Sequence, residues 1–108
     1  MNLTQETMQR LEFLFTEASR AEAASLLERE CSTNLPFLDK ASPTDLQRFR
    51  FAALKLSGGN LDRLRNAIEL AKQDWRDLLV SAGFANSCDA HLHWQPRKHE
   101  KHYKDRTA

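Results

Sequence analysis

The chain has 108 residues, enough for one domain with a single hydrophobic core. Hydrophobic residues make up 41% and charged residues 29% of it, a composition that excludes a disordered or membrane-embedded chain. Its 16 Lys and Arg residues against 15 Asp and Glu residues give a formal net charge of +1, so no overall field directs it toward nucleic acid or anionic lipid.

The charges are unevenly distributed. Residues 97–108 hold five basic and two acidic residues, a net charge of +3, and little apolar surface to bury. We therefore predict one helical domain over 1–96 and a mobile basic tail over 97–108. The N-terminal residues lack the pattern of a secretory signal, which predicts a cytoplasmic protein. Cys31 and Cys88 match no disulfide framework and are read as reduced thiols, with Cys31 in the core.

The first helix is predicted to start near Thr4. Ser19 followed by Glu22 forms a capping-box pattern, which predicts a break there and a second helix behind it. The apolar positions at helical spacing in these two segments are Met8, Leu11, Leu14, Phe15, Ala18, Ala23, Ala24, Leu27 and Cys31.

The next segment, 32–42, is a connection whose apolar residues 35–38 we expect to lie across the helices. Ser42 and Pro43 then give a strong helix start, and Gly58 and Gly59 end that helix. The inward positions of the predicted 43–57 helix are Leu46, Phe49, Ala53 and Leu56.

The strongest apolar pattern covers residues 61–82, behind an N-cap at Asn60. Gly83 is predicted to end this element, with Phe84 folding back on its last turn. We predict one helix, kinked near Gln73; the alternative is a new N-cap at Asp74 that divides it into two. The repeat consists of Leu61, Leu64, Ile68, Ala71, Trp75, Leu78 and Ala82.

A last short turn is predicted after Asp89, carrying Ala90, Leu92 and Trp94 and ended by Pro96. Only three glycines and three prolines occur in the chain, too few for the turns of an all-β fold. The predicted fold class is therefore all-α, a compact bundle of four to five helices with a short C-terminal helical turn.

Several apolar residues lie off the predicted core faces. One interpretation makes the 43–57 helix central, with neighbours on two sides; the other makes the surplus residues an interaction surface for a second copy or another protein. The residues concerned are Phe13, Phe51, Leu54, Leu70 and Val80.

Candidate chemistry is sparse. Cys88, His91 and His93 are the densest set of metal-ligand types, but they lack the paired spacing of a structural zinc site. The alternative places exposed histidines beside a packed Trp94. No nucleophile, phosphate-loop or cofactor pattern is present, so we predict neither an enzyme nor a cofactor.

The 43–57 and 61–82 segments with their short turn have a layout like a helix–turn–helix. Asp62, Arg63, Arg65 and Asn66 would begin the recognition helix. The acidic residues Glu69 and Asp77 on the same element would repel phosphates, so nucleic-acid binding through this region and the tail is the second hypothesis. The leading hypothesis is a non-enzymatic adaptor or regulatory module that binds a protein partner or itself. A small metal-binding protein is the third.

Residues 67–94 contain Asp74, Trp75, Arg76 and Asp77 followed by Leu78-Leu79 and, further on, Ala82-Gly83-Phe84. This segment resembles a group of small bacterial helical proteins. The resemblance implies a bacterial, intracellular, helical protein and assigns no function to it. From the residues themselves we expect Trp75 to lie in the core and Arg76 and Asp77 to face outward, with a functional role for the motif left open.

Overall fold

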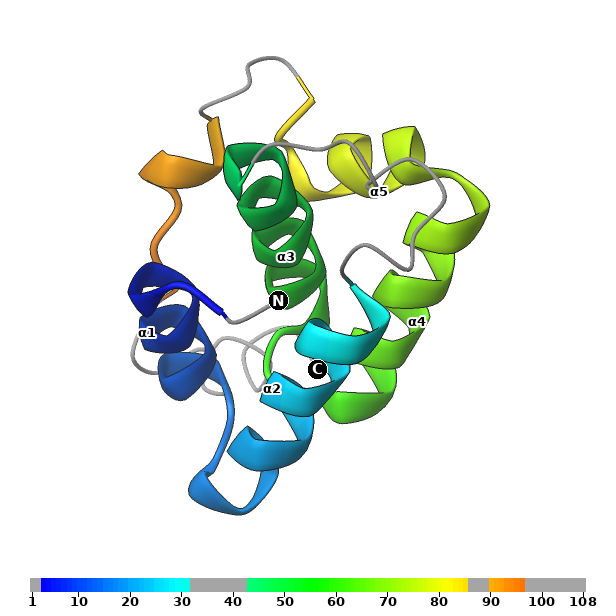
Figure 1. Ribbon diagram of the computed structural model, residues 1–108. Helices are drawn as coiled ribbons and strands as arrows, with labels where there is room; N and C mark the ends of the chain where they lie inside the picture. The colour runs from blue at the N-terminus through cyan, green and yellow to red at the C-terminus, as the bar shows by residue number, and fades with distance from the viewer. Residues whose placement is uncertain (1–2, 32–42, 86–89, 97–108) are drawn as a thin grey trace, which may run out of the picture.

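The structure is a computed structural model that describes residues 3–31, 43–85 and 90–96. The described part is helical throughout and contains no strand, which confirms the all-α prediction (Figure 1). None of its helices is long and apolar enough to cross a membrane. In chain order the elements are α1 (Gln5–Leu14), α2 (Glu17–Glu30), α3 (Pro43–Ser57), α4 (Leu61–Gln73), α5 (Trp75–Ala82) and a short 3₁₀ turn, η1 (Ala90–His93).

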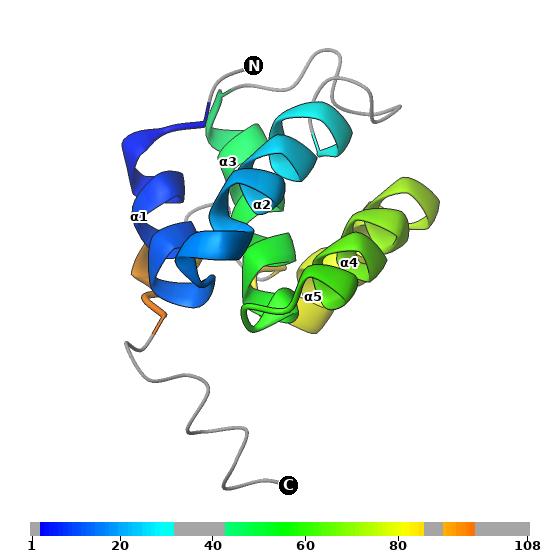
Figure 2. The same ribbon diagram turned by 90° about the horizontal axis from the view of Figure 1, so that it is seen from below.

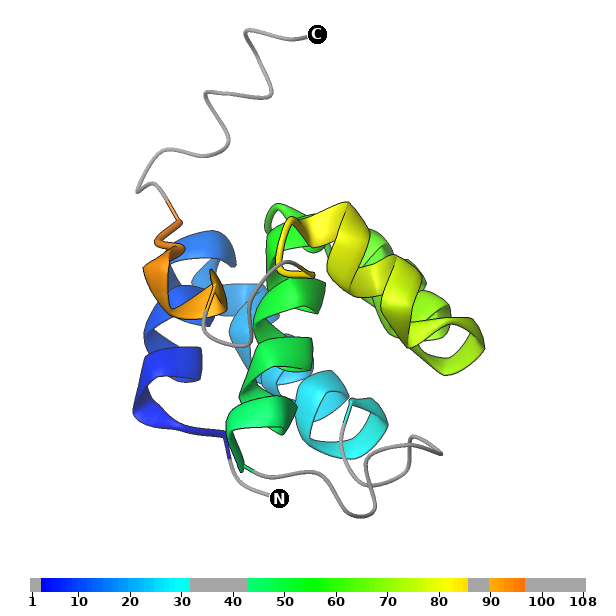
Figure 3. The same ribbon diagram turned by 90° about the horizontal axis from the view of Figure 1, so that it is seen from above.

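Helix α3 lies at the centre of the fold. It packs against α1, α4, α5 and η1, and α1 and α5 lie on opposite sides of it (Figures 1 and 3). Four consecutive residues of α3, from 51 to 54, are fully buried. A helix with neighbours on several sides needs apolar residues on more than one face, so α3 needs more of them than a one-sided helix would.

The central position of α3 corrects part of the predicted interaction surface. Phe51 and Leu54 are fully buried, so assigning them to the surface was wrong and the interpretation of α3 as the central helix was right. The ring of Phe51 makes edge contacts with His91, at 5.2 Å between ring centroids, and with Trp94, at 6.0 Å. These partners come from the C-terminal segment, whose docking on α3 is not encoded in the local pattern of the helix.

The boundary between α1 and α2 lies earlier than predicted. Helix α1 ends at Leu14, Phe15 and Thr16 are extended, and Ser19 lies inside the first turn of α2, so the predicted start at Ser19 was wrong. By leaving the helix, Phe15 turns its side chain into the core, where it is 2% exposed. Arg20 donates from Nε to the Phe15 carbonyl at 3.1 Å, which holds the bend.

The 61–82 segment is two helices, so the prediction of one kinked helix was wrong and the Asp74 alternative was right. The Asp74 carboxylate accepts from the backbone N–H groups of Arg76, at 3.1 Å, and Asp77, at 3.3 Å, as an N-cap. This local bond outweighs the continuous apolar repeat, because α5 can still bury Leu78 and Ala82 after the break.

The end of α5 follows the predicted pattern. Gly83 has a φ of 80°, and the backbone N–H of Phe84 donates to the Leu79 carbonyl at 2.8 Å, a Schellman motif. The Phe84 ring is buried. Lys55 on α3 adds a hydrogen bond from Nζ to the Ala82 carbonyl at 2.8 Å, so α5 ends against α3.

Some predictions fall outside the described residues. They are the packing of the 32–42 connection, the Ser42 cap, the identity of Asp89 as a cap, the position of Cys88 and the mobility of the 97–108 tail.

The turn between α3 and α4 depends on its second glycine. Gly59 has a φ of 87°, and a Cβ added there would overlap the backbone carbonyl of Leu14 at the end of α1. Gly58 also has a positive φ, 56°, but a Cβ there would meet no atom within 4 Å. Both glycines therefore have a left-handed backbone, but only at Gly59 would an added Cβ overlap another part of the chain.

We expect Gly59→Ala to lower the free energy of unfolding by about 3 kcal/mol or more, because backbone overlap adds to the left-handed strain. The matched control Gly58→Ala carries only the strain and should cost about 1 kcal/mol. Urea unfolding followed by far-UV circular dichroism measures both. Equal losses for the two variants would contradict the close approach of the turn to α1.

Candidate functional site

The exposed apolar side chains identify the surfaces that can bind. Among the described residues the large apolar side chains most exposed to solvent are Phe13 on α1 (49%), Val80 on α5 (62%) and Leu92 on η1 (47%). Phe13 and Val80 belong to the predicted interaction surface, but they lie on helices at opposite sides of α3 (Figure 3). The predicted residues therefore do not form one patch.

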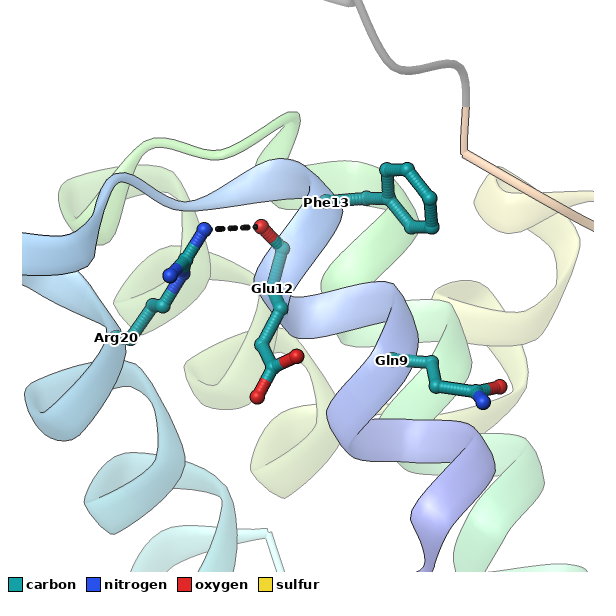
Figure 4. Close-up of a pocket in the computed structure, with 4 residues that line it drawn as sticks. All are labelled: Gln9, Glu12, Phe13 and Arg20. Atoms are coloured by element: carbon teal, nitrogen blue, oxygen red, sulfur yellow. Dashed lines mark hydrogen bonds between the residues drawn. The ribbon is translucent and has the colours of Figure 1, made fainter.

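Phe13 lies beside an open pocket. The pocket has a volume of about 410 Å³ and is lined by Gln9, Glu12, Phe13 and Arg20 (Figure 4). We call these four residues the Phe13 surface. Its far edge is Arg20, whose Nη2 donates to the Glu12 backbone carbonyl at 3.0 Å.

The bend at Phe15 creates this pocket. In α1, Leu11 points into the core and Phe13, two residues later, points outward because positions two apart on a helix lie on different sides. After the bend, α2 returns alongside α1 and brings Arg20 beside Glu12. An aromatic ring, a carboxylate, a guanidinium and an amide thus surround one concave surface.

Behind this surface, a buried arginine joins α1 to the C-terminal segment. Arg10 is 4% exposed and donates to the Glu6 carbonyl from Nη1 and to the Trp94 carbonyl from Nε, both at 3.0 Å. Its guanidinium carbon lies 4.3 Å from the centroid of the Phe51 ring, a cation–π contact. Burial lowers the pKa of Arg10, and the charge of Glu6 partly offsets this shift.

The environment of His91 differs most from the one predicted from the sequence. It was expected on the surface, or with Cys88 and His93 at a metal, but it is fully buried. Its Nε2 lies 3.2 Å from Oε1 of Gln47, and the Gln47 amide donates to the Thr4 hydroxyl at 3.0 Å. The available signal was the three-residue spacing of His91 and Trp94, which a 3₁₀ turn places on one side.

The candidate metal ligands are not brought together where the structure describes them. His93 is exposed, whereas His91 points into the aromatic core, and Cys88 lies outside the described ranges. Within residues 3–31, 43–85 and 90–96, no three Cys, His, Asp or Glu side chains are grouped to hold a metal ion.

A second pocket lies between α2 and α4, which are neighbours on the face seen in Figure 2. It has a volume of about 330 Å³ and includes Leu26 and Ile68. Two ion pairs cross between the helices nearby: Glu22 with Arg65, and Glu30 with Lys72 at 2.8 Å. The hydrogen bond and charge of Lys72 lower the pKa of Glu30, and Glu30 and Glu69 raise the pKa of Lys72.

A third, smaller pocket contains Leu70, the remaining member of the predicted interaction surface. Leu70 is half-buried and lines a volume of about 220 Å³ with Leu56 and Ala67, between α3 and α4. Arg63 and Asn66, two residues of the hypothetical recognition helix, also line it. This position keeps Leu70 partly accessible but separates it from the exposed ring of Phe13 on α1.

The Asp74–Asp77 motif has a structural role in the fold. Asp74 is the N-cap of α5, and Trp75 packs edge-on against Phe49 with ring centroids 5.7 Å apart. Arg76 and Asp77 are exposed as expected, and the guanidinium carbon of Arg76 lies 5.3 Å from the Trp75 ring centroid. Asp74 thus begins α5 at the α4–α5 corner, and Trp75 packs α5 against α3.

Cys31 is a core residue, as predicted. It is fully buried at the end of α2, and burial raises the pKa of its thiol to about 12. Its carbonyl accepts a hydrogen bond from Nε of the buried Arg50 at 3.0 Å. A thiol with such a pKa is not a nucleophile at neutral pH.

Comparison with known proteins yields no relative: no protein-family model, curated protein or solved structure matches the chain. The resemblance of residues 67–94 to small bacterial helical proteins stays a prediction. The functional argument therefore starts from the surfaces described above.

We expect Arg10→Lys to lower the free energy of unfolding by about 2–3 kcal/mol, because an ammonium group cannot reproduce the two-carbonyl geometry of a buried guanidinium. Arg29→Lys is the control, since Arg29 is exposed and its Nε donates to the Ser25 hydroxyl at 2.8 Å. That control should change stability by less than about 0.5 kcal/mol. Equal losses of stability for the two variants in chemical denaturation would contradict the role of the hydrogen bond from Arg10 to the Trp94 carbonyl.

We expect the Glu30–Lys72 ion pair to make a small, pH-dependent contribution to the free energy of unfolding. Because the folded pKa of Glu30 lies below its ordinary value of 4.5, the pair stabilises the fold above that pH and is lost as the pH falls through the folded pKa. A double-mutant cycle with Glu30→Gln and Lys72→Met should give under about 1 kcal/mol at pH 7, since the groups are exposed. We expect this coupling to vanish in strong acid and to weaken in high salt. A coupling that persists in acid would contradict the assignment.

Proposed function

We propose that this protein is a non-enzymatic interaction module that binds a partner protein through the Phe13 surface. The observation that carries the proposal is the half-exposed ring of Phe13 beside an open pocket. Aromatic residues are enriched in the cores of protein interfaces, where a few of them supply most of the binding energy.

The structure around Phe13 makes its exposed ring suitable for binding a partner. The ring stands on a helix that is fixed from behind by the buried Leu11 and Arg10, so little conformational freedom is lost when a partner covers it. Full burial of a Phe side chain contributes about 1.5–3 kcal/mol. The adjoining pocket can receive a side chain of the partner, which a flat exposed ring cannot do.

Nucleic-acid binding through the α3–α4 region is less well supported. Arg65, at the start of the hypothetical recognition helix, is paired with Glu22 and also with Asp62 at 3.2 Å. A guanidinium with two carboxylate partners offers less positive charge to phosphate groups. Within the proposal, the resemblance of residues 67–94 favours a bacterial cytoplasmic setting for the module.

Site-specific photo-crosslinking tests the proposal. A benzophenone amino acid replaces Phe13 in cells of the source organism, and the control carries it at Gln73, an exposed position on α4. We expect a crosslinked product of defined mass from position 13 only, because a bound partner covers that position. Identical crosslinked products from both positions, or no product from position 13, would contradict the proposed interaction through Phe13.

A further inference from the structure

The Phe13 surface is surrounded by carboxylates that face solvent. Glu12 lines the pocket itself, Glu6 lies on the same side of α1 two turns before Phe13, and Glu17 opens α2 just after the bend. All three residues are exposed. Glu6 and Phe13 are seven residues apart on α1, which corresponds to about 10 Å along the helix axis. A short peptide segment bound at Phe13 is long enough to reach Glu6.

The neighbouring cations, Arg10 and Arg20, compensate the charge of these three carboxylates only in part. Arg10 points inward, where the carbonyls of Glu6 and Trp94 and the ring of Phe51 hold it. Arg20 lies at the pocket edge, but its Nε and Nη2 donate to the carbonyls of Phe15 and Glu12 at the end of α1. The partial negative charge of a helix C-terminus offsets part of such a guanidinium charge.

We propose, building on the interaction function above, that the partner presents a basic segment with one apolar anchor. The anchor, an aromatic or leucine side chain, packs against Phe13 in the pocket, and flanking Lys or Arg residues pair with Glu6, Glu12 and Glu17. Charge complementarity of this kind selects the partner and speeds its encounter more than it adds affinity.

The same charges disfavour a second copy of this surface as the occupant. A two-fold symmetric dimer centred on Phe13 would bring the three carboxylates of one copy close to the same three carboxylates of the other. Like charges facing each other across an interface repel and oppose association. The structure therefore favours a foreign basic segment over self-association at this face.

Selection from a library of short random peptides on the immobilised full chain tests the inference. We expect the enriched peptides to carry net positive charge and one aromatic or leucine residue. Phe13→Ala should weaken their binding about tenfold or more, as loss of an interface anchor does. Combined Glu12→Gln and Glu17→Gln should weaken it about threefold to tenfold and reduce its dependence on salt.

Two controls separate these effects from general changes in the protein. Val80→Ala removes an exposed apolar side chain on α5, and Asp77→Asn removes an exposed carboxylate, both on the opposite side of α3. Binding by these variants should match that of the wild type. Circular dichroism verifies that every variant is folded.

The contrary results are distinguishable. Peptides that need Phe13 but are acidic or neutral would overturn the basic partner and leave the interaction function standing. A selection that yields no peptide distinguishing the wild type from Phe13→Ala would overturn both. A concentration-dependent dimer in light scattering that Phe13→Ala abolishes would assign the surface to a second copy and overturn the inference.

Discussion

Hydrogen bonds from arginine and lysine side chains to main-chain carbonyls hold the C-terminal ends of α1, α2, α5 and η1 in place. Short helices leave a large share of their carbonyls without intrahelical partners, and a buried carbonyl must find a donor elsewhere. Here the donors come from other elements and join them, so each end is also a tertiary contact. The pairs are Arg20 with Glu12 and Phe15, Arg50 with Cys31, Lys55 with Ala82, Arg48 with Phe84, and Arg10 with Trp94.

This arrangement explains how the chain forms an acidic surface although its net charge is close to zero. Arg10 and Arg20 are used within the fold, and the carboxylates near them are left at the surface. The bend that turns Phe15 inward also brings Arg20 back to Glu12, near the outward-facing ring of Phe13. One local departure from the helix thus shapes the pocket and places a guanidinium at its edge.

The sequence predicted the features that depend on neighbours in the chain. The glycine ends of α3 and α5 and the exposure of Phe13 follow from turn chemistry and helical spacing. Where two local signals competed, as the apolar repeat and the Asp74 cap did, the hydrogen bonds of the cap decided the result, and α5 still buries Leu78 and Ala82. The burial of Phe51 followed from one of the two interpretations, the central α3 helix. Its contact with His91 could not be predicted, because it requires segments distant in the sequence to dock together.

The bond from Arg10 to the Trp94 carbonyl joins residues 84 positions apart. A ribosome makes α1 long before the Trp94 carbonyl exists. The guanidinium must stay hydrated until residue 94 has left the exit tunnel. Final closure of the core is therefore an event that follows the synthesis of residue 94, and a nascent chain interrupted before that point keeps its aromatic interior open to chaperones.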